Sequence, residues 1–116
     1  MKTKAVRIYG VHDLRLEEFE LPEMAEDEIQ ARIITDSLCL STWKVQNQGA
    51  KHKKLPNDLE NNPVIMGHEF CGIIEQVGAK WQHLYKPGDK FVAQPNLMRE
   101  DTFTMGYSFP YVGGEA

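Results

Sequence analysis

The sequence contains little cysteine and no long apolar run. Its two cysteines, Cys39 and Cys71, are too few among 116 residues to build a disulfide-linked scaffold. No apolar run approaches the roughly 20 residues that a membrane-spanning helix needs. The first ten residues include basic side chains but lack the apolar stretch of a secretory signal. These absences predict a cytoplasmic protein without a membrane partner.

Positive charge is also scarce. Lysine and arginine together number 13, against 17 aspartates and glutamates, which gives a formal net charge of −4. A chain with this balance has no basic field to attract nucleic acid, so no nucleic-acid partner is expected. Hydrophobic residues make up 41% of the chain and charged residues 26%. These fractions predict one globular domain.

The dinucleotide-binding fingerprint is missing as well. That fingerprint places G-x-G-x-x-G between a strand and a helix. None of the nine glycines fits this arrangement, and no strand–helix–strand pattern accompanies them. Residues 1–116 are therefore not expected to hold a nicotinamide cofactor by themselves.

Short strands dominate the pattern that is present. Alternating or β-branched apolar residues predict strands at 5–9, 13–21, 28–35, 70–77 and 90–94. The alternation slips between Leu16 and Phe19, which predicts a β-bulge there. One short helix is expected within 38–48, a solvated loop at 49–62, and a loop from 95 to 116. Short strands joined by polar turns indicate a mainly β barrel or sandwich.

The segment GHEFCGIIEQVG, residues 67–78, places His68 and Glu69 at the start of an apolar strand pattern. Histidine, cysteine and carboxylate are the usual zinc ligands, and a catalytic zinc site needs three of them with a fourth position open. Cys39 lies 29 residues upstream and is the available thiol. On spacing alone these residues indicate either a zinc site or ordinary buried side chains.

Five segments in the same order resemble the zinc-dependent medium-chain alcohol and polyol dehydrogenases. The zinc-site signature of that family, Gly-His-Glu followed by two spaced glycines, resembles residues 67–78. The family's first-ligand segment resembles SLCLSTWK, and further matches are HDLRLEEFELPEM, KPGDKFV and YVGGEA. Within the family, sugar- and polyol-phosphate reductases are the most similar. The matches extend over nearly the whole chain.

This resemblance implies a GroES-like β-barrel that carries zinc. Cys39 and His68 would be zinc ligands, and Glu69 would be a third ligand or an outer acid that can move onto the metal. Ser41 would pass the substrate proton outward, so Ser41 and Glu69 are the candidate catalytic residues. In such enzymes zinc acts as a Lewis acid while hydride moves to NAD(P). The substrate would be a small-molecule alcohol, polyol or sugar phosphate.

Several positions depart from the family pattern. Leu40 replaces a glycine, Thr42 replaces an aspartate that steadies the zinc-bound histidine, and Lys44 replaces a relay histidine. Residues 95–109 lack the four cysteines of a structural zinc site, so a second zinc is not expected. Residues 1–116 would be the N-terminal part of a GroES-like catalytic domain, incomplete at its C-terminus. Alone it would be inactive, because NAD(P) would bind only the full-length enzyme.

Two other functions remain open from the residues. One is a non-catalytic metal-binding or structural β-barrel, and the other is a zinc-free quinone-reductase relative, a branch that generally lacks the cysteine and histidine present here. An open barrel edge also predicts a homo-oligomer, with the tail 95–116 at the interface. A phosphorylated substrate would find its positive charge at residues 51–54.

The remaining chemistry-bearing side chains have expectations of their own. Cys71 is expected in the core, like many free cysteines. Trp43 and Trp81 are expected to pack in the barrel, with contact to substrate as the alternative for Trp43. Solvated turns are expected for the other three histidines, His12, His52 and His83.

Overall fold

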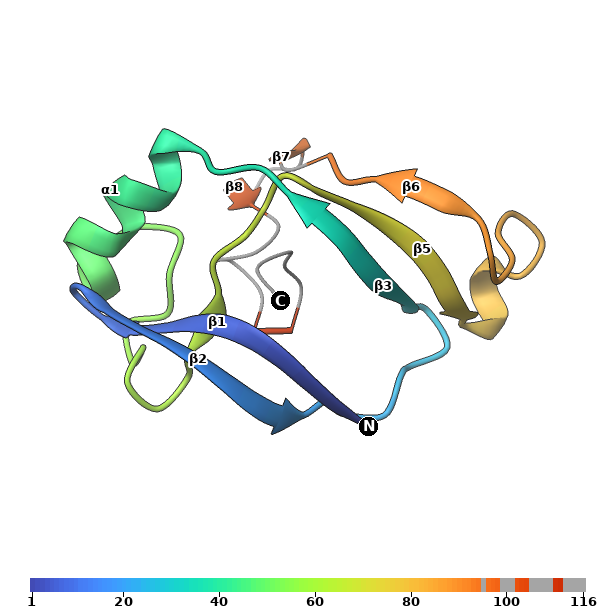
Figure 1. Cartoon of the computed structure of the whole chain (residues 1–116), viewed down its shortest axis with the longest axis horizontal. Helices are drawn as coiled ribbons and strands as arrows, with labels where there is room; N and C mark the ends of the chain where they lie inside the picture. The colour runs from blue at the N-terminus through green and yellow to red at the C-terminus, as the bar shows by residue number, and fades with distance from the viewer. Residues whose placement is uncertain (95, 99–101, 105–109, 112–116) are drawn as a thin grey trace.

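The computed structural model of the protein describes residues 1–94, 96–98, 102–104, 110 and 111. Strands dominate these residues, and their one α-helix is short, so the predicted mainly β class is confirmed (Figure 1). The element order is β1 Lys2–Gly10, β2 Asp13–Glu20, β3 Ile29–Asp36, α1 Leu40–Gln48, η1 Gly49–Lys51, β4 Val64–Ile65, β5 Phe70–Val77, η2 Ala79–Trp81, β6 Lys90–Val92, β7 Asn96–Met98 and β8 Thr102–Thr104.

The first sheet has the order β2-β1-β4, with both pairs antiparallel. Leu16 and Phe19 pair with Val6 and Thr3 in one unbroken register, so the predicted bulge between them is wrong. The irregularity lies in β1 instead, between Ile8 and Gly10. The apparent slip arose because β2 carries apolar side chains on both faces, and Leu16 is 61% exposed.

The second sheet has the order β3-β5-β6 and is also antiparallel. Its central strand approaches β3 closely at Gly72, where an added Cβ atom would lie 2.3 Å from the carbonyl oxygen of Arg32. At the far end of the sheet, Nε1 of Trp81 donates to the carbonyl of Asp27 at 2.8 Å. Trp81 is 38% exposed there, so its predicted packing inside the barrel is wrong.

A hydrophobic core lies between α1, β1, β4 and the segment that joins α1 to β4. Its fully enclosed side chains come from all four parts and are Ile8, Val45, Leu55, Leu59, Val64 and Met66. Leu55 and Leu59 are 6% and 1% exposed, so the interpretation of 49–62 as a solvated loop is wrong for these two positions. They turn inward while the charged residues around them stay outside. Val45 anchors α1 to this core.

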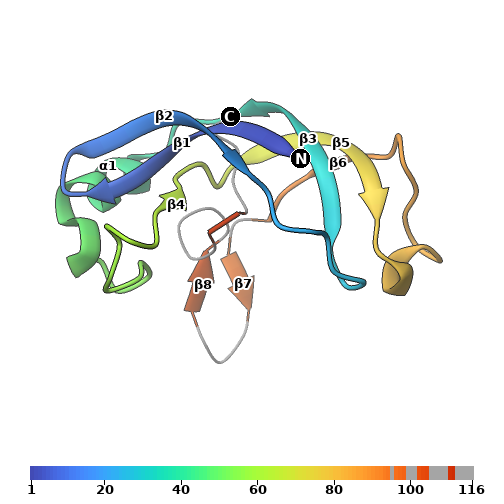
Figure 2. The same cartoon turned by 90° about the horizontal axis from the view of Figure 1, so that it is seen from below.

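The tail was expected to be a loop, but it contains the antiparallel pair β7–β8. Figure 2 shows this pair projecting away from the two larger sheets. The remaining residues of the segment 95–116, apart from 110 and 111, lie outside the described residues. The expectation that this tail forms an interface therefore stays a prediction.

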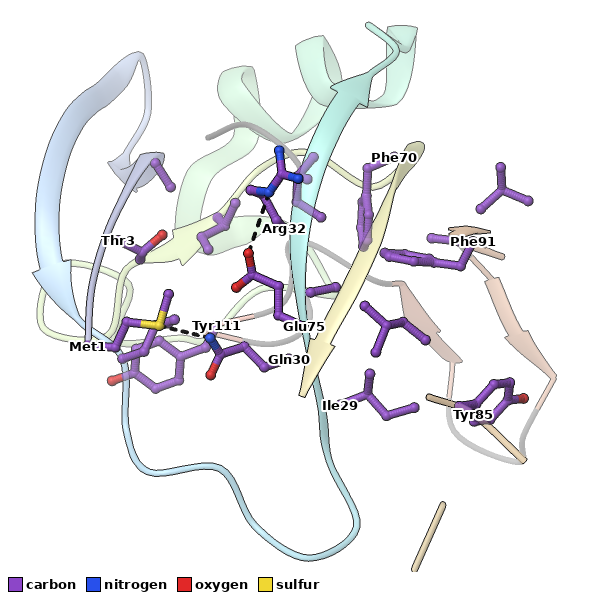
Figure 3. Close-up of a pocket in the computed structure, with 18 of the residues that line it drawn as sticks. Met1, Thr3, Ile29, Gln30, Arg32, Phe70, Glu75, Tyr85, Phe91 and Tyr111 are labelled. Atoms are coloured by element: carbon purple, nitrogen blue, oxygen red, sulfur yellow. Dashed lines mark hydrogen bonds and ion pairs between the residues drawn. The ribbon is translucent and has the colours of Figure 1, made fainter. Parts of the chain in front are cut away.

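An open cavity of about 660 Å³ separates the two larger sheets (Figure 3). Its lining is mostly apolar and comes from both sheets, including Ala5, Ile33, Ile65, Phe70, Ile74 and Phe91. The rings of Phe70 and Phe91 meet edge to face with centroids 6.2 Å apart. The described residues thus leave the space between the sheets unfilled. Among them, no helix has both the length and the apolar character needed to cross a membrane.

Candidate metal centre

Cys39 lies at the N-terminal end of α1. Its backbone is extended, with φ −118° and ψ 145°, and its carbonyl accepts the N–H of Thr42 at 3.0 Å, so the helix begins directly after it. A serine or aspartate here would use its side chain to cap the helix. Cys39 makes no such capping bond. Its half-buried thiol instead faces the segment around His68.

His68 lies between β4 and β5 and is only 5% exposed. Its Nδ1 atom lies 3.4 Å from the carbonyl oxygen of Met66. In the tautomer that donates from Nδ1 to this carbonyl, Nε2 has a lone pair that can bind a metal ion. Nε2 lies 2.9 Å from Oγ of Ser41. His68 thus presents the nitrogen that a metal ion requires.

Two hydrogen bonds join the end of β3 to the start of β5. The N–H of Ser37 donates to the carbonyl of Glu69 at 3.0 Å, and the N–H of Glu69 donates to Oδ1 of Asp36 at 3.1 Å. Asp36 also pairs with Phe70 at this end of the β3–β5 ladder. Because Cys39 follows Asp36 by three residues, these contacts bring the thiol to the His68-Glu69 pair.

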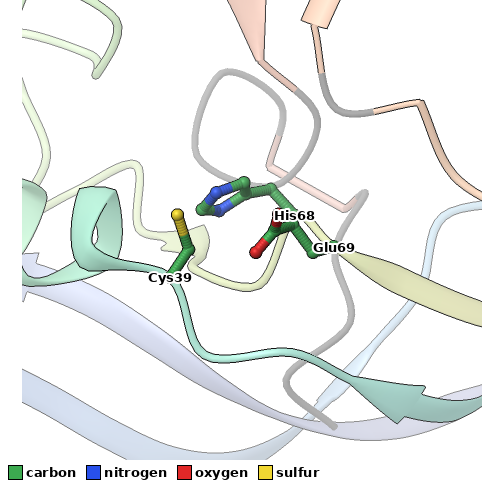
Figure 4. A group of neighbouring side chains, drawn as sticks. All are labelled: Cys39, His68 and Glu69. Carbon is green, nitrogen blue, oxygen red and sulfur yellow. The ribbon is translucent and has the colours of Figure 1, made fainter.

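The ligand atoms of Cys39, His68 and Glu69 all lie within 4.8 Å of one another. Figure 4 shows the three side chains converging from the start of α1 and the start of β5. His68 is buried, Cys39 half-buried and Glu69 exposed, so the group opens to solvent on the glutamate side. The structure therefore brings together the three side chains that were predicted to be metal ligands.

The donor set fits a zinc ion. Thiolate, imidazole and carboxylate bind zinc at about 2.0–2.3 Å. Because the three ligand atoms lie within 4.8 Å of one another, small side-chain movements would allow all three to bind one ion. Three protein ligands leave a fourth position open, which is the arrangement of catalytic rather than structural zinc.

Ser41 contacts two of the three candidate ligands. Its hydroxyl donates to Sγ of Cys39 at 3.1 Å and lies 2.9 Å from Nε2 of His68. The hydroxyl has one proton to donate and two lone pairs, so it can exchange partners when a ligand or substrate changes the local charge. Ser41 therefore lies in direct contact with the candidate metal group.

Asp36 belongs to the site although no motif pointed to it. Burial raises the pKa of its carboxyl, while the N–H groups of Glu69 and Ser37 and the nearby His68 act in the opposite direction. Its Oδ2 atom is buried without a hydrogen-bond partner among the described residues. The sequence could have indicated Asp36 only by its position, because this acidic residue directly follows the strand segment IQARIIT and precedes Cys39 by three residues.

Cys71 lies apart from the metal group. It is half-buried rather than fully in the core, and its Sγ lies 3.2 Å from Oγ1 of Thr35. His12 and His83 are exposed as expected. His52 is half-buried, which corrects the expectation of a solvated turn, and burial together with Lys54 and Lys53 lowers its pKa.

Exposed apolar side chains surround the start of α1. Leu38, Leu40 and Trp43 are 90%, 70% and 59% exposed. The predicted packing of Trp43 in the barrel is therefore wrong, because its side chain is largely exposed on α1. Single exposed apolar residues are common, but three within six positions form a patch next to the metal group.

Comparison with known proteins decides the family. The family model described as "Alcohol dehydrogenase GroES-like domain" matches residues 25–114. The chain belongs to the alcohol dehydrogenase GroES-like family. The match in this family includes all four predicted site residues, Cys39, Ser41, His68 and Glu69.

Relatives of known name agree with this family. The chain is 59% identical over 115 residues to an L-sorbose 1-phosphate reductase of Klebsiella pneumoniae, covering 98% of this chain and 28% of that protein. It is 41% identical over 115 residues to a mannitol-1-phosphate 5-dehydrogenase of Aliivibrio fischeri, covering 99% of this chain and 27% of that protein. The chain thus spans little more than a quarter of the length of these relatives.

A solved structure confirms the GroES-like fold. The 2R,3R-butanediol dehydrogenase of Bacillus subtilis superposes with a TM-score of 0.80 at 26% sequence identity, covering 98% of this chain and 36% of that chain. The superposition includes β1 and β2, which precede the family-model match. The GroES-like fold therefore includes the first two strands as well as the residues that the family model matches.

Proposed function

We propose that this chain is the zinc-binding, N-terminal part of the catalytic domain of an NAD(P)-linked oxidoreductase. Its substrate would be an alcohol, a polyol or a sugar phosphate. The observation that carries the proposal is the convergence of Cys39, His68 and Glu69 within 4.8 Å in a GroES-like chain, with Ser41 in contact with two of them.

The side chains divide the work as follows. Cys39, His68 and Glu69 would hold the zinc, which when bound supplies a Lewis acid that lowers the pKa of an alcohol. A hydrogen bond from Nδ1 of His68 to the carbonyl of Met66 would orient the ring so that Nε2 can bind the metal. Ser41 would accept the proton of the substrate hydroxyl and release it toward solvent. Trp43, exposed on the helix that begins after Cys39, would contact the substrate.

A phosphorylated substrate is the finer part of the proposal. The two relatives described above are named for sorbose 1-phosphate and mannitol 1-phosphate. Lys51, Lys53 and Lys54 supply positive charge shortly after α1, and lysine binds phosphate as a point charge. These lysines follow the C-terminal end of α1, whereas Cys39 lies at its N-terminal end. The two ends of this nine-residue helix are about 13 Å apart along its axis. Lys44, three positions after Ser41, is the nearer positive charge.

The nicotinamide would bind elsewhere in the full-length polypeptide, since residues 1–116 contain no dinucleotide fingerprint. A homo-oligomer in the cytoplasm is the expected setting. Its oligomeric contacts would cover the open apolar cavity between the two sheets.

The test uses the full-length polypeptide that carries this chain, loaded with zinc. Reduction of sorbose 1-phosphate and oxidation of mannitol 1-phosphate are followed through the absorbance of reduced NAD(P). We expect turnover that Cys39→Ser abolishes and that Ser41→Ala lowers about 100-fold, the usual scale for a lost proton-transfer group. Zinc binding without NAD(P)-dependent turnover on these compounds and on simple polyols would favour the alternative, a non-catalytic metal-binding barrel.

A further inference from the structure

Asp36 connects the two chain segments that carry the candidate ligands. It is the last residue of β3, and its Oδ1 atom accepts the N–H of Glu69 at 3.1 Å. The neighbouring N–H of Ser37 donates to the carbonyl of Glu69 at 3.0 Å. Glu69 is thus held on both sides of its backbone, while its carboxylate stays free to turn toward Cys39 and His68.

The second carboxylate oxygen of Asp36 has no evident structural use. Oδ2 is buried, and no hydrogen-bond partner for it exists among the described residues. An unpartnered buried carboxylate oxygen is destabilising, so a neutral residue would serve better if anchoring Glu69 were the whole role of Asp36. A cation bound nearby would offset the cost of this unpartnered oxygen.

The positive charge has a place beside it. Oδ1 of Asp36 is bonded to the N–H of Glu69, so its carboxylate lies against the residues of the candidate metal group. A divalent cation bound by Cys39, His68 and Glu69 would bring two positive charges to the same site. Electrostatic attraction to a nearby carboxylate would then stabilise the bound cation.

We propose that Asp36 is a positioning residue of the metal centre, which orients Glu69 through its backbone and strengthens cation binding through its buried negative charge. This inference rests on the proposed function, because it assumes that the three-residue group binds zinc. Asp36 precedes Cys39 by three residues and contacts Glu69, so it links the two segments that carry the candidate ligands.

The decisive variant is Asp36→Asn. Asparagine keeps the shape and an acceptor oxygen for the N–H of Glu69 but removes the charge. The zinc dissociation constant of the full-length polypeptide is measured by competition with a chromophoric chelator, and thermal unfolding is measured without metal. We expect the dissociation constant to rise 10- to 100-fold, the range for carboxylates that support metal ligands. The metal-free midpoint should stay the same or increase.

Three further measurements separate the explanations. Glu75→Gln, which removes a carboxylate that pairs with exposed Arg32, is the matched control and should leave zinc affinity unchanged. In cobalt-substituted protein, Asp36→Asn should shift the visible bands, since the ligand field changes. If Asp36→Asn does not fold, Asp36→Glu decides, because it keeps the charge: retained zinc binding supports the proposal, and lost binding in a folded protein overturns it.

An unchanged dissociation constant in folded Asp36→Asn, or an equal loss in Glu75→Gln, would also overturn the proposal. Such a result leaves the proposed function intact, since wild-type zinc binding is measured in the same series. Failure of the wild-type protein to bind zinc would instead overturn the proposed function itself.

Discussion

The hydroxyl of Ser41 lies 2.9 Å from Nε2 of His68, although 27 residues separate the two in the sequence. The contact exists because α1 begins directly after Cys39, which turns Ser41 back toward the segment that precedes β5. The same hydroxyl also donates to Cys39. A single side chain therefore contacts two of the three candidate metal ligands, Cys39 and His68.

Removal of either Cys39 or His68, the two less exposed candidate ligands, should abolish metal uptake. Cys39→Ala and His68→Ala each leave two donors, too few to hold zinc firmly. We expect zinc content to fall close to zero in both, measured by elemental analysis of purified protein. Cys71→Ala is the matched control, because Cys71 contacts Thr35 outside the metal group and its loss should leave zinc content unchanged. Wild-type zinc content in Cys39→Ala or His68→Ala would contradict the assignment.

Gly72 should tolerate no side chain. An added Cβ atom would lie 2.3 Å from the carbonyl oxygen of Arg32, so Gly72→Ala must push β3 and β5 apart. We expect the free energy of unfolding to fall by about 2 kcal/mol or more, the scale of overpacking in a core. Urea denaturation measures the change. Gly10→Ala is the control, since nothing lies within 4 Å of its added Cβ atom, and equal losses in the two variants would contradict this account.

His52 should make folding stability sensitive to mild acid. Its pKa is lowered from the ordinary 6.5 by burial and by Lys54 and Lys53, so the unfolded chain binds the proton first. The stability that its neutral form contributes is therefore present above about pH 6.5 and is lost as the pH falls through the lower folded value. Urea denaturation of His52→Gln and wild type at several pH values tests this. The variant should lose less stability than wild type between neutral and acidic pH, and parallel losses would contradict the prediction.

The lysines after α1 should matter only for a phosphorylated substrate. Replacing Lys51, Lys53 and Lys54 by glutamine in the full-length polypeptide should lower kcat/KM for a sugar phosphate about tenfold or more. The value for the unphosphorylated sugar should hardly change. Lys44→Gln is tested in parallel. If only this variant lowers kcat/KM for the sugar phosphate, the phosphate binds near the first turns of α1 instead. Equal kcat/KM for both substrates in wild type would remove the phosphate hypothesis.

Self-association should accompany the open cavity between the sheets. The cavity has a volume of about 660 Å³ and a mostly apolar lining, and exposing that lining to water is unfavourable. Two identical chains can cover it by contacts across a two-fold axis. Light scattering of the 116-residue chain at micromolar concentration should show a dimer or larger assembly. A folded monomer across the concentration range would contradict this expectation.

Some features of this protein follow from the sequence alone. The candidate zinc ligands stand in two short motifs, one around Cys39 and one around His68 and Glu69, and each motif could be compared directly with a known family. Strand periodicity and the helix near Cys39 are likewise local, because they depend on neighbouring side chains and backbone preferences. These signals predicted the mainly β fold and the residues of the candidate site.

Other features needed the tertiary structure. The bulge in β1, the burial of Leu55 and Leu59, and the exposure of Trp43 depend on which distant strand or loop covers each position. The role of Asp36 is the clearest case, since its partner Glu69 lies 33 residues away and only the pairing of β3 with β5 brings them together. Residue type and spacing carry no record of such pairing, because the free energy that selects it comes from contacts made after the chain has folded.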